Sequence, residues 1–545
     1  MKSSMMDYQL TLTGILRRAK EVYPDRELVT RRADGGLDRY TYGEFYQRVL
    51  KLMQVLRAQG VKPGDRVATF AWNNARHLEL YFAVPCLGAV LHTLNIRLFP
   101  DQLTYIAKHA EDQIIFVDAD LISQLEEVKD DLPTVRQFVV MDENSQLPET
   151  TLSPVAEYES LLSEQEAIEE FPDVDENSAA AMCYPSGTTG NPKGVVYSHR
   201  AIYLHSMCAC MNDVLGIKEA DSILPMTSMF HANCWGIPYA AVMTGAKMVF
   251  PGVNPRSKDL ADLIAQEKVT LCSGVPTIWN MLYQHLESEP QDISSLENIV
   301  CGGSAVPKSL MEKFDQTYNV SINQLWGMTE LTPLGTVSLL QHDMHAWDDD
   351  ARYAVRAKQG VPVPGVEVNI IDNDGQSQPW DGASIGELCV RGPWVVREYY
   401  NNPGAASSFT DDGWFRTGDV ASMDARGYMQ IADRTKDLIK SGGEWISSVE
   451  MENALMAHPD ILEAAVVARP DDKWDERPMA YVVPVEGADE RLTDDALYDF
   501  LLQHFAKWQV PYKGDYRVID AVPKTSVGKF DKKVLRQHYE DARRR

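Results

Sequence analysis

The chain has 545 residues, of which 44% are hydrophobic and 24% are charged, a balance that is typical of a globular protein and excludes a disordered or fibrous one. Lys and Arg number 52 against 79 Asp and Glu, which gives a formal net charge of −27 at pH 7. This acidic excess argues against general binding to nucleic acid or to an anionic membrane, because both need basic patches.

The N-terminal segment lacks the pattern of an export signal, since Asp7 and Gln9 interrupt any hydrophobic core of a signal peptide. The apolar stretch 81–94 contains Pro85 and His92 and is too short to cross a membrane. The eight cysteines are dispersed and form no C-x2-C pair, which indicates reduced thiols rather than a zinc site. We therefore expect a cytoplasmic protein without stable membrane insertion.

From about residue 60 to 330, short apolar runs alternate with longer helical patterns. A helix is expected through residues 77–87 and another over 199–215. This alternation predicts βαβ units around largely parallel sheets, and ligands of such sheets bind beyond the carboxyl ends of the strands. The expected strands are 67–70, 114–117, 138–141, 179–184, 223–225, 247–250, 269–273 and 298–301.

Beyond residue 360 the pattern changes to short β-rich segments separated by Gly and Pro. The segments 360–368, 386–391 and 427–432 predict an antiparallel or barrel-like subdomain. From Asp433 onward the pattern is that of a separate small α+β unit. Its predicted elements are a helix that opens with a capping-box pattern at Ser447 and Glu450 and runs to about Ala457, strands at 464–468 and 480–484, and a helix near 494–505.

The strongest local signal is a loop that follows the strand expected at 179–184. It reads Tyr184-Pro-Ser-Gly-Thr-Thr-Gly-Asn-Pro-Lys-Gly194 and holds three glycines, three hydroxyl residues and one Lys. Glycine lets successive amides turn inward around phosphate oxygens, and Lys193 adds a compact cation. The Walker A spacing does not fit this loop. We predict a phosphate-binding loop formed by Ser186, Gly187, Thr188, Thr189, Gly190 and Lys193.

This loop resembles the signature of the adenylate-forming superfamily, which includes acyl-CoA synthetases, firefly-type luciferases and adenylation domains of peptide synthetases. Other motifs of the superfamily follow in order along nearly the whole chain: Gly302-Gly-Ser-Ala-Val-Pro307, Trp326-Gly-Met-Thr-Glu330, Thr417-Gly-Asp419, Asp433-Arg-Thr-Lys-Asp-Leu-Ile-Lys-Ser-Gly-Gly443 and Pro523-Lys-Thr-Ser-Val-Gly-Lys529. Ordered motifs are far more specific than any one of them.

The resemblance implies an α/β fold with two domains. Residues 1–433 are expected to form a large N-terminal domain of two βαβ-type sheets plus a small β-barrel-like subdomain. Residues 434–545 are expected to form a small mobile α+β domain, with a hinge near 434–437.

The resemblance also implies an ATP-dependent acid–CoA ligase that uses ATP, Mg²⁺ and coenzyme A. The carboxylate first attacks the α-phosphate of ATP, giving acyl-AMP and pyrophosphate. The thiol of CoA then attacks acyl-AMP, giving acyl-CoA and AMP. Cations and hydrogen-bond donors are needed where the two anions of the first step approach each other.

By resemblance, the nucleoside and α-phosphate are bound by four of these motifs. Trp326 is expected to stack beside the adenine, at a position where the family usually has Tyr. Asp419 is expected to accept hydrogen bonds from both ribose hydroxyls, with Arg434 assisting. Small residues let the backbone approach a planar base closely. The remaining candidates of the nucleotide site are Gly302, Gly303, Ser304, Gly327 and Thr329.

The resemblance assigns the reacting groups to a few further side chains. Lys529 is expected to bridge the substrate carboxylate and the α-phosphate, because a Lys point charge suits a charge that spreads over several oxygens. Glu330 is the expected Mg²⁺ ligand, with Ser186 as a second oxygen ligand. Thr329 and His231 join Lys529 as catalytic candidates.

Thioester formation is expected to follow a rotation of the C-terminal domain about Lys436. The rotation brings a new segment to the active site, and its glycines admit the slim pantetheine chain. A Cys or His nucleophile is not required, because the adenylate is already activated. The residues expected to line the pantetheine tunnel are Lys440, Ser441, Gly442, Gly443, Glu444 and Trp445.

The segment 229–235 is the candidate for recognition of the acyl group. His231 and Trp235 are four residues apart at an expected helix start, so both are expected to point the same way. A pocket rimmed by Trp235 suits a modest, mostly aliphatic acid, although a Trp is also often buried in the core. Gly302 and Pro333 complete the substrate candidates. The segments 230–235 and 440–448 are similar to 3-methylmercaptopropionate–CoA ligases and to short- and medium-chain fatty acid–CoA ligases.

Two other functional classes are weighed against the acid–CoA ligase. An adenylation enzyme that loads a separate carrier protein would share the first step, but too few residues follow Lys529 for a carrier domain. A non-catalytic binding protein would not need Lys193, Glu330, Asp419 and Lys529 together. A ligase for longer fatty acids is a further alternative. The expected partners are a small carboxylic acid, ATP and CoA, without nucleic acid, and a homodimer stays open.

Overall fold

The computed structural model describes residues 1, 3–185, 191–372, 374–434, 437–441, 444–471, 473–485, 487–525 and 530–544. The chain divides into two compact units. Unit 1 comprises Met1–Val300, Gly327–Gly335 and Gly392–Ser407, and unit 2 comprises Cys301–Trp326, Thr336–Arg391 and Ser408–Arg545. The division of the chain at residue 433 stays a prediction.

A seven-stranded sheet in unit 1 carries the start of the phosphate loop. Its order is β7-β6-β5-β3-β4-β8-β9, and every pair is parallel except β8 with β9. The inner strands β3, β4, β5, β6 and β8 are buried along nearly their whole length, as expected where helices cover a parallel sheet, whereas the edge strands β7 and β9 are partly exposed. The strands of the sheet are β3 (Arg66–Phe70), β4 (Val90–Thr93), β5 (Asp112–Asp118), β6 (Gln137–Met141), β7 (Val155–Glu157), β8 (Ala179–Cys183) and β9 (Val195–Ser198).

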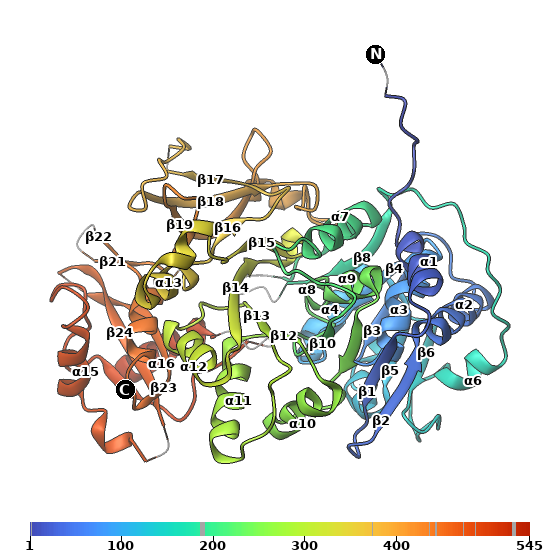
Figure 1. The fold of residues 1–545 in the computed structure, drawn as a ribbon, viewed down its shortest axis with the longest axis horizontal. Helices are drawn as coiled ribbons and strands as arrows, with labels where there is room; N and C mark the ends of the chain where they lie inside the picture. Colours follow the sequence, from blue (N-terminus) through green and yellow to red (C-terminus); the bar gives the residue numbers. More distant parts are fainter. Residues whose placement is uncertain are drawn as a thin grey trace. The chain divides into compact units, whose positions relative to one another are not determined.

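A second sheet of unit 1 contains the order β12-β10-β11-β1-β2, parallel except for the β1–β2 pair (Figure 1). These strands are β1 (Glu27–Arg31), β2 (Leu37–Thr41), β10 (Ser222–Pro225), β11 (Lys247–Phe250) and β12 (Leu271–Gly274). The two parallel-rich sheets confirm the predicted α/β class.

Helices α1, α2 and α3 pack on one another in unit 1, and α7 packs on α9. The expected helix over 77–87 is α3, whereas the helix expected over 199–215 ends at Ala209. The following turn contains Asn212, Asp213 and Gly216, which has a φ of 64°, and such residues favour turns over helix. The helices of unit 1 are α1 (Leu12–Val22), α2 (Tyr42–Ala58), α3 (Ala75–Cys86), α4 (Pro100–Ala110), α5 (Ile122–Glu126), α6 (Tyr158–Ser163), α7 (His199–Ala209), α8 (Ala232–Trp235), α9 (Ile237–Thr244), α10 (Ser257–Glu267) and α11 (Pro276–Ser288).

Unit 2 contains an antiparallel four-stranded sheet in the region expected to be β-rich. Its order is β17-β18-β19-β20, formed by Glu367–Ile371, Ile385–Arg391, Phe415–Met423 and Met429–Arg434. The other elements of unit 2 before this region are α12 (Lys308–Tyr318), α13 (Asp349–Arg356) and β16 (Val361–Pro362). The strands β13 (Asn298–Cys301), β14 (Ser321–Gly327) and β15 (Leu334–Val337) each contain residues of both units.

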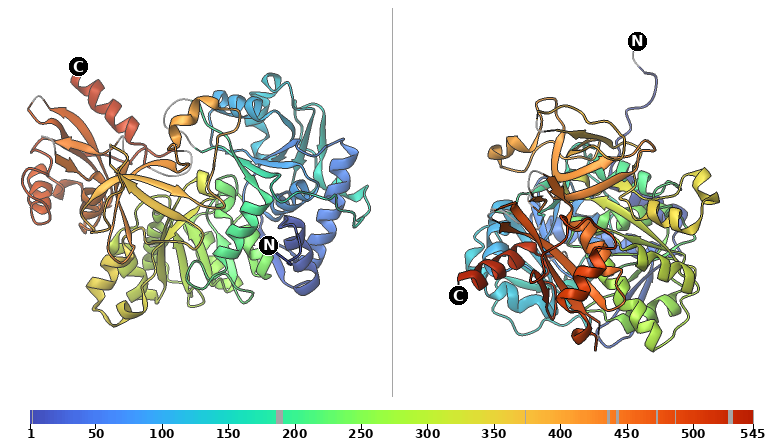
Figure 2. Two further views of the ribbon diagram at one scale, coloured as in Figure 1. Left: turned by 90° about the horizontal axis from the view of Figure 1, so that it is seen from above. Right: turned by 90° about the vertical axis from the view of Figure 1, so that its left-hand side faces the viewer.

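A five-stranded sheet follows near the C-terminus, with β25 pairing with β24 beside the path β22-β21-β24-β23 (Figure 2). Alternate residues of β23 and β24 enter two separate cores, one with α14 and α15 and one with Leu535 of α16, as the period of two in a strand requires. The predicted helix start is confirmed, because the Glu450 N–H donates to Ser447 Oγ at 3.1 Å. The elements are β21 (Ile439–Ser441), β22 (Glu444–Ile446), α14 (Ser448–Met456), β23 (Ile461–Asp471), β24 (Asp475–Pro484), α15 (Asp494–Leu501), β25 (Tyr516–Val518) and α16 (Lys532–Arg544).

None of the helices in the described ranges has both the length and the apolar composition that a membrane crossing requires.

Candidate active site

The two ends of the predicted phosphate loop are held in unit 1. Tyr184 follows β8, and its hydroxyl lies 2.7 Å from Nδ1 of His109. At the other end, the Tyr400 N–H donates to the Gly194 carbonyl at 2.9 Å. Lys193 Nζ lies 4.7 Å from the centre of the Tyr399 ring. The predicted loop residues Ser186, Gly187, Thr188, Thr189 and Gly190 lie outside the described residues.

Tyr399 connects Lys193 to the predicted metal ligand. Its hydroxyl donates to Oε1 of Glu330 at 2.7 Å, while its ring faces Lys193. Burial and the Glu330 carboxylate both raise the pKa of Tyr399, so this phenol remains a donor at neutral pH. The Tyr197 hydroxyl donates at 2.7 Å to the carbonyl of Thr329, which precedes Glu330 in a short 3₁₀ turn. The structure thus brings Lys193, Thr329 and Glu330 together through two tyrosines.

Glu330 fits Mg²⁺ better than a metal that needs an all-protein cage. Glu330 is only 6% exposed. The described part of the chain contains no group of three or more His, Cys, Asp and Glu residues that could hold a metal ion. Mg²⁺ is usually held by one or two carboxylates together with substrate phosphates and water. A buried carboxylate connected through Tyr399 to Lys193 at the end of a phosphate loop therefore suits this ion.

The predicted nucleotide residues of unit 2 meet at Asp419. The Trp326 indole N–H donates to Oδ2 of Asp419 at 2.9 Å, and Nε of Arg434 lies 2.7 Å from Oδ1. Asp419 and Arg434 are direct cross-strand neighbours on β19 and β20. The Asp419 side chain is 4% exposed, against 44% for Arg434. The indole N–H and the carboxylate thus orient each other, which fixes the plane of the Trp326 ring.

Close backbone approaches explain two of the predicted glycines. A Cβ at position 302 would lie 2.6 Å from Cδ1 of Leu325 and 3.0 Å from its carbonyl oxygen. A Cβ at position 327 would lie 2.1 Å from the carbonyl oxygen of Pro333, the remaining substrate candidate. Gly303 has a φ of 85° in the left-handed region, and Ser304 is exposed. These glycines are required by packing, whatever ligand they face.

The predicted pantetheine segment forms a small hairpin of unit 2. Strands β21 and β22 pair antiparallel, with Lys440 opposite Trp445 and Ser441 opposite Glu444. The Lys440 N–H donates to Oε2 of Glu476 at 2.8 Å, and Ser441 Oγ accepts from Arg477 at 3.1 Å. Lys436, Gly442, Gly443 and Lys529 lie outside the described residues.

The helix start expected to carry His231 and Trp235 is wrong, because the backbone there is not right-handed. The four residues of α8 have φ angles of 42° to 56°, and Gly236 follows at 71°. This is a left-handed turn that begins only after His231, so the i, i+4 spacing of a right-handed helix does not describe how the two side chains are placed. His231 precedes the turn with a φ of −113° and is partly exposed, whereas Trp235 is 7% exposed.

Buried polar contacts hold this left-handed turn. Cys183 Sγ lies 2.6 Å from Oδ1 of Asn233, whose amide nitrogen donates to the Tyr239 hydroxyl at 3.2 Å. The Cys234 thiol donates to the Thr227 carbonyl at 3.0 Å. Each left-handed L-residue costs roughly 1–2 kcal/mol, so the turn persists only because its surroundings impose it.

The sequence motifs missed the aromatic residues around the loop: His109, Tyr197, Tyr399 and Tyr400. The residues that contact one another here are separated by 69 to more than 130 positions in the sequence. A local sequence pattern therefore cannot reveal these contacts. The sequence signal that could have indicated these residues is the pair of adjacent tyrosines, Tyr399 and Tyr400, because residues in connecting segments often belong to a functional site.

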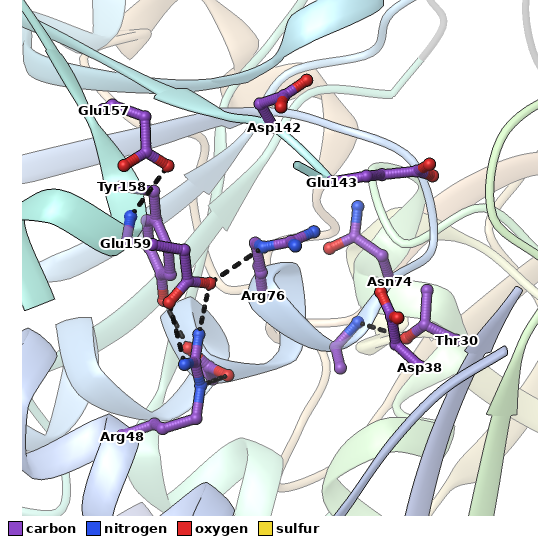
Figure 3. A network of polar contacts seen from close by, with 12 residues as sticks. Thr30, Asp38, Arg48, Asn74, Arg76, Asp142, Glu143, Glu157, Tyr158 and Glu159 are labelled. Carbon is purple, nitrogen blue, oxygen red and sulfur yellow. Dashed lines mark hydrogen bonds and ion pairs between the residues drawn. The ribbon is translucent and has the colours of Figure 1, made fainter. Parts of the chain in front are cut away.

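A separate cavity of unit 1 has a polar lining and a volume of about 160 Å³ (Figure 3). Arg48 and Arg76 both point toward Glu159 there, at 2.7 and 3.1 Å. Arg48 also contacts the fully buried Glu79, which accepts from two tyrosine hydroxyls. The charged groups satisfy one another, which indicates a structural network. The cavity is lined by Thr30, Asp38, Tyr40, Arg48, Ala75, Arg76 and Glu159, none of which belongs to the predicted site.

Comparisons with known proteins agree along the whole chain. The family described as AMP-binding enzyme matches residues 16–400, and the AMP-binding enzyme C-terminal domain matches residues 450–529. A long-chain-fatty-acid–CoA ligase of Thermus thermophilus is 46% identical over 99% of this chain and 97% of its own length. A 3-methylmercaptopropionyl-CoA ligase of Ruegeria lacuscaerulensis is 41% identical over 99% of both chains. The crystal structure of the anthranilate CoA ligase AuaEII in complex with anthranoyl-AMP superposes with a TM-score of 0.87 over 100% of both chains, at 24% identity.

Proposed function

Because the chain belongs to the family of AMP-binding enzymes, we propose that it is an ATP-dependent acid–CoA ligase. The observation that carries the proposal is the linkage of Lys193, Tyr399 and Glu330 beside the ends of the phosphate loop. Cation, phenol and buried carboxylate together suit a nucleoside triphosphate with its metal ion. Identities above 40% to CoA ligases over 99% of the chain support it.

The proposed reaction has two steps. A carboxylate oxygen of the acid forms a bond to the α-phosphorus of ATP, and the α–β phosphoanhydride bond breaks to release pyrophosphate. The sulfur of CoA then attacks the acyl carbon, AMP leaves, and the thiol proton passes to solvent. Lys193 would hold the terminal phosphates, and Thr329 would contact the α-phosphate. Mg²⁺ bound at Glu330 would neutralise charge on the phosphate oxygens.

Asp419 and Trp326 would hold the nucleoside, the first through its carboxylate and the second through its ring. We propose that residues 434–545 move as a domain about a hinge at 434–437, which would exchange Lys529 for the β21–β22 hairpin at the reacting centre. The hairpin pairing of Lys440 with Trp445 supports a single rigid segment for the pantetheine chain.

For the acid, we propose an unbranched aliphatic chain, with 3-methylmercaptopropionate or short- and medium-chain fatty acids as substrates. A sulfur atom in the chain is apolar and close to a methylene in size, so one pocket serves both kinds of acid. A longer fatty acid is the second candidate, because the Thermus thermophilus relative is a long-chain-fatty-acid–CoA ligase.

All eight cysteines are free, and seven of them are buried, which supports a reducing compartment such as the cytoplasm. A homodimer stays a prediction that light scattering in solution would test.

The function is tested by ATP–pyrophosphate exchange together with AMP release, measured with and without CoA across a panel of acids. A ligase exchanges pyrophosphate with acid alone and releases AMP in turnover only when CoA is added. Exchange without any CoA-dependent AMP release would instead indicate an enzyme that loads a carrier protein. Absence of exchange with every acid would contradict the proposal.

Replacing Asp419 with alanine is expected to weaken ATP binding by about 10- to 150-fold. The change removes the acceptor proposed for the ribose and also the partner of the Trp326 indole, and a hydrogen bond to a charged group contributes about 1.5–3 kcal/mol. The dissociation constant is measured by calorimetry. Glu367→Ala is the matched control, since its ion pair with Arg391 is exposed and such pairs contribute little. Equal affinities of Asp419→Ala and the control would remove Asp419 from the site.

Replacing Trp235 with alanine is expected to shift the preference toward longer acids. If the indole bounds the pocket, its removal opens volume for a longer chain, and each badly filled methylene position costs a short acid about 1–3 kcal/mol. The measurement is competition between butanoate, hexanoate, 3-methylmercaptopropionate and a C16 acid. An unchanged ranking, or a wild-type preference for the C16 acid, would show that Trp235 does not limit chain length.

A further inference from the structure

A cluster of aromatic side chains joins the two ends of the phosphate loop in unit 1. Its members come from β4, α4, β5 and the residues that border the loop, and none of them lies in a sequence motif used above except Tyr184. We call it the loop clamp, formed by His92, Tyr105, His109, Asp112, Tyr184 and Tyr400.

His109, in the last turn of α4, contacts both ends of the loop. Its Nδ1 is 2.7 Å from the hydroxyl of Tyr184, which precedes the loop. Its ring meets that of Tyr400 edge to face, at 5.6 Å and 88°. Tyr400 in turn donates to the Gly194 carbonyl, which closes the loop. One imidazole therefore spans the start and the end of a segment of eleven residues.

Close packing leaves the two ends little freedom. A Cβ at position 194 would lie 3.0 Å from Cζ of Tyr184 and 3.2 Å from Cβ of Tyr400. Tyr105 stacks on His109, with ring centres 5.6 Å apart at 15°. The imidazole is thus held between three tyrosine rings, and a substitution there releases both ends at once.

A buried hydrogen-bonded pair supports Tyr184 from the sheet. Nδ1 of His92 lies 2.8 Å from Oδ1 of Asp112, and both side chains are fully buried. The His92 ring lies 5.2 Å from the ring of Tyr184. His92 also neighbours Met182 across the β4–β8 pair, so the strand that leads into the loop and the first residue after it share one rigid base.

We propose that His109 is a positioning residue for ATP, which holds the two described ends of the phosphate loop, at Tyr184 and Gly194, in place. The proposal rests on the proposed function, in which this loop binds ATP. Donors that are oriented before the ligand arrives avoid the cost of ordering them on binding. Acyl-AMP has no β- or γ-phosphate, so thioester formation from supplied acyl-AMP does not need the clamp.

The geometry predicts which substitutions preserve the function. Burial lowers the pKa of His109, so a neutral imidazole faces Tyr184 at pH 7. The amide of Asn reaches the position of Nδ1, whereas the amide of Gln reaches that of Nε2. His109→Asn is therefore expected to keep the contact with Tyr184, and His109→Gln is expected to lose it.

The test compares His109→Ala, His109→Asn and His109→Gln with the wild-type protein. ATP affinity is measured by calorimetry without acid, and the two half-reactions are assayed separately. His109→Ala is expected to weaken ATP binding about five- to tenfold, the effect of one hydrogen bond, and to leave the rate from acyl-AMP within about twofold. His109→Asn should restore affinity and His109→Gln should not.

Tyr184→Phe keeps the ring but removes the hydroxyl, so it should reproduce the loss, and the double variant should lose no more than either single variant. His345→Ala, an exposed histidine, is the matched control. The positioning role of His109 would be overturned by any of three results. These are wild-type ATP affinity in His109→Ala, equal rescue by the Asn and Gln variants, and equal loss of rate in both half-reactions. Should His109→Ala not fold, the Asn, Gln and Tyr184→Phe variants decide. Because calorimetry needs only ATP binding, it decides this role even if the exchange assay contradicts the ligase reaction.

Discussion

Replacement of Lys529 with alanine is expected to lower acyl-AMP formation by two to three orders of magnitude, about 3–4 kcal/mol, while thioester formation from supplied acyl-AMP stays near the wild-type rate. Removal of a group that stabilises charge in only one transition state has effects of this size. By the family resemblance, Lys529 meets the reacting anions only during adenylation.

The described residues before and after Lys529 are held next to each other. Lys524 and Phe530 form an antiparallel bridge, and the Asp531 N–H donates to the Pro523 carbonyl at 2.7 Å. The described chain segments at 523–524 and 530–531 are therefore hydrogen-bonded to each other. Lys533→Ala is the matched control, since Lys533 is exposed a few residues further on. Equal loss of both half-reactions in Lys529→Ala would contradict the assignment.

Replacement of Arg48 with methionine is expected to destabilise the protein by about 3–5 kcal/mol, because it leaves the buried carboxylate of Glu79 without its cation. Nε of Arg48 lies 2.6 Å from Oε1 of Glu79, whose side chain is fully buried. The free energy of unfolding is followed by urea denaturation of the transition that includes unit 1.

The double variant Arg48→Met/Glu79→Gln separates loss of the ion pair from loss of packing. It is expected to be more stable than Arg48→Met alone, because no uncompensated charge remains buried. Arg391→Met is the control, since its partner Glu367 is 61% exposed. A single variant as stable as this control would show that Glu79 is compensated by its tyrosine hydroxyls alone.

Much of the fold could be predicted because local apolar runs determine it. The runs at 67–70 and 114–117 are buried on both faces of a parallel sheet, and this is the pattern that a continuous apolar run indicates. The helix expected to reach residue 215 was too long, because turn-forming residues after Ala209 outweigh its apolar spacing.

The left-handed turn could not be predicted, because distant side chains impose it. Asn73 accepts from the Met229 N–H and donates to the carbonyls of Pro225 and Thr227, which fixes the chain just before Ala232. The contact of Tyr399 with Glu330 is likewise invisible locally, since 69 positions separate them. The motifs identify residues whose chemistry is known. They do not identify the tyrosines that connect these residues or the unusual backbone of the turn, because neither produces a local sequence pattern.

The left-handed turn at 232–235 also has a consequence for engineering the enzyme. Glycine adopts positive φ without strain, so Ala232→Gly would relieve backbone strain at the loss of a single methyl group. Four non-glycine residues in this turn fit its proposed role beside the acid, as a trade-off in which stability is given up for a fixed backbone. A variant selected for heat resistance would tend to acquire glycine in this turn and broaden its range of acids. Selection for a narrow acid range would keep the strain and change the residues packed around it instead.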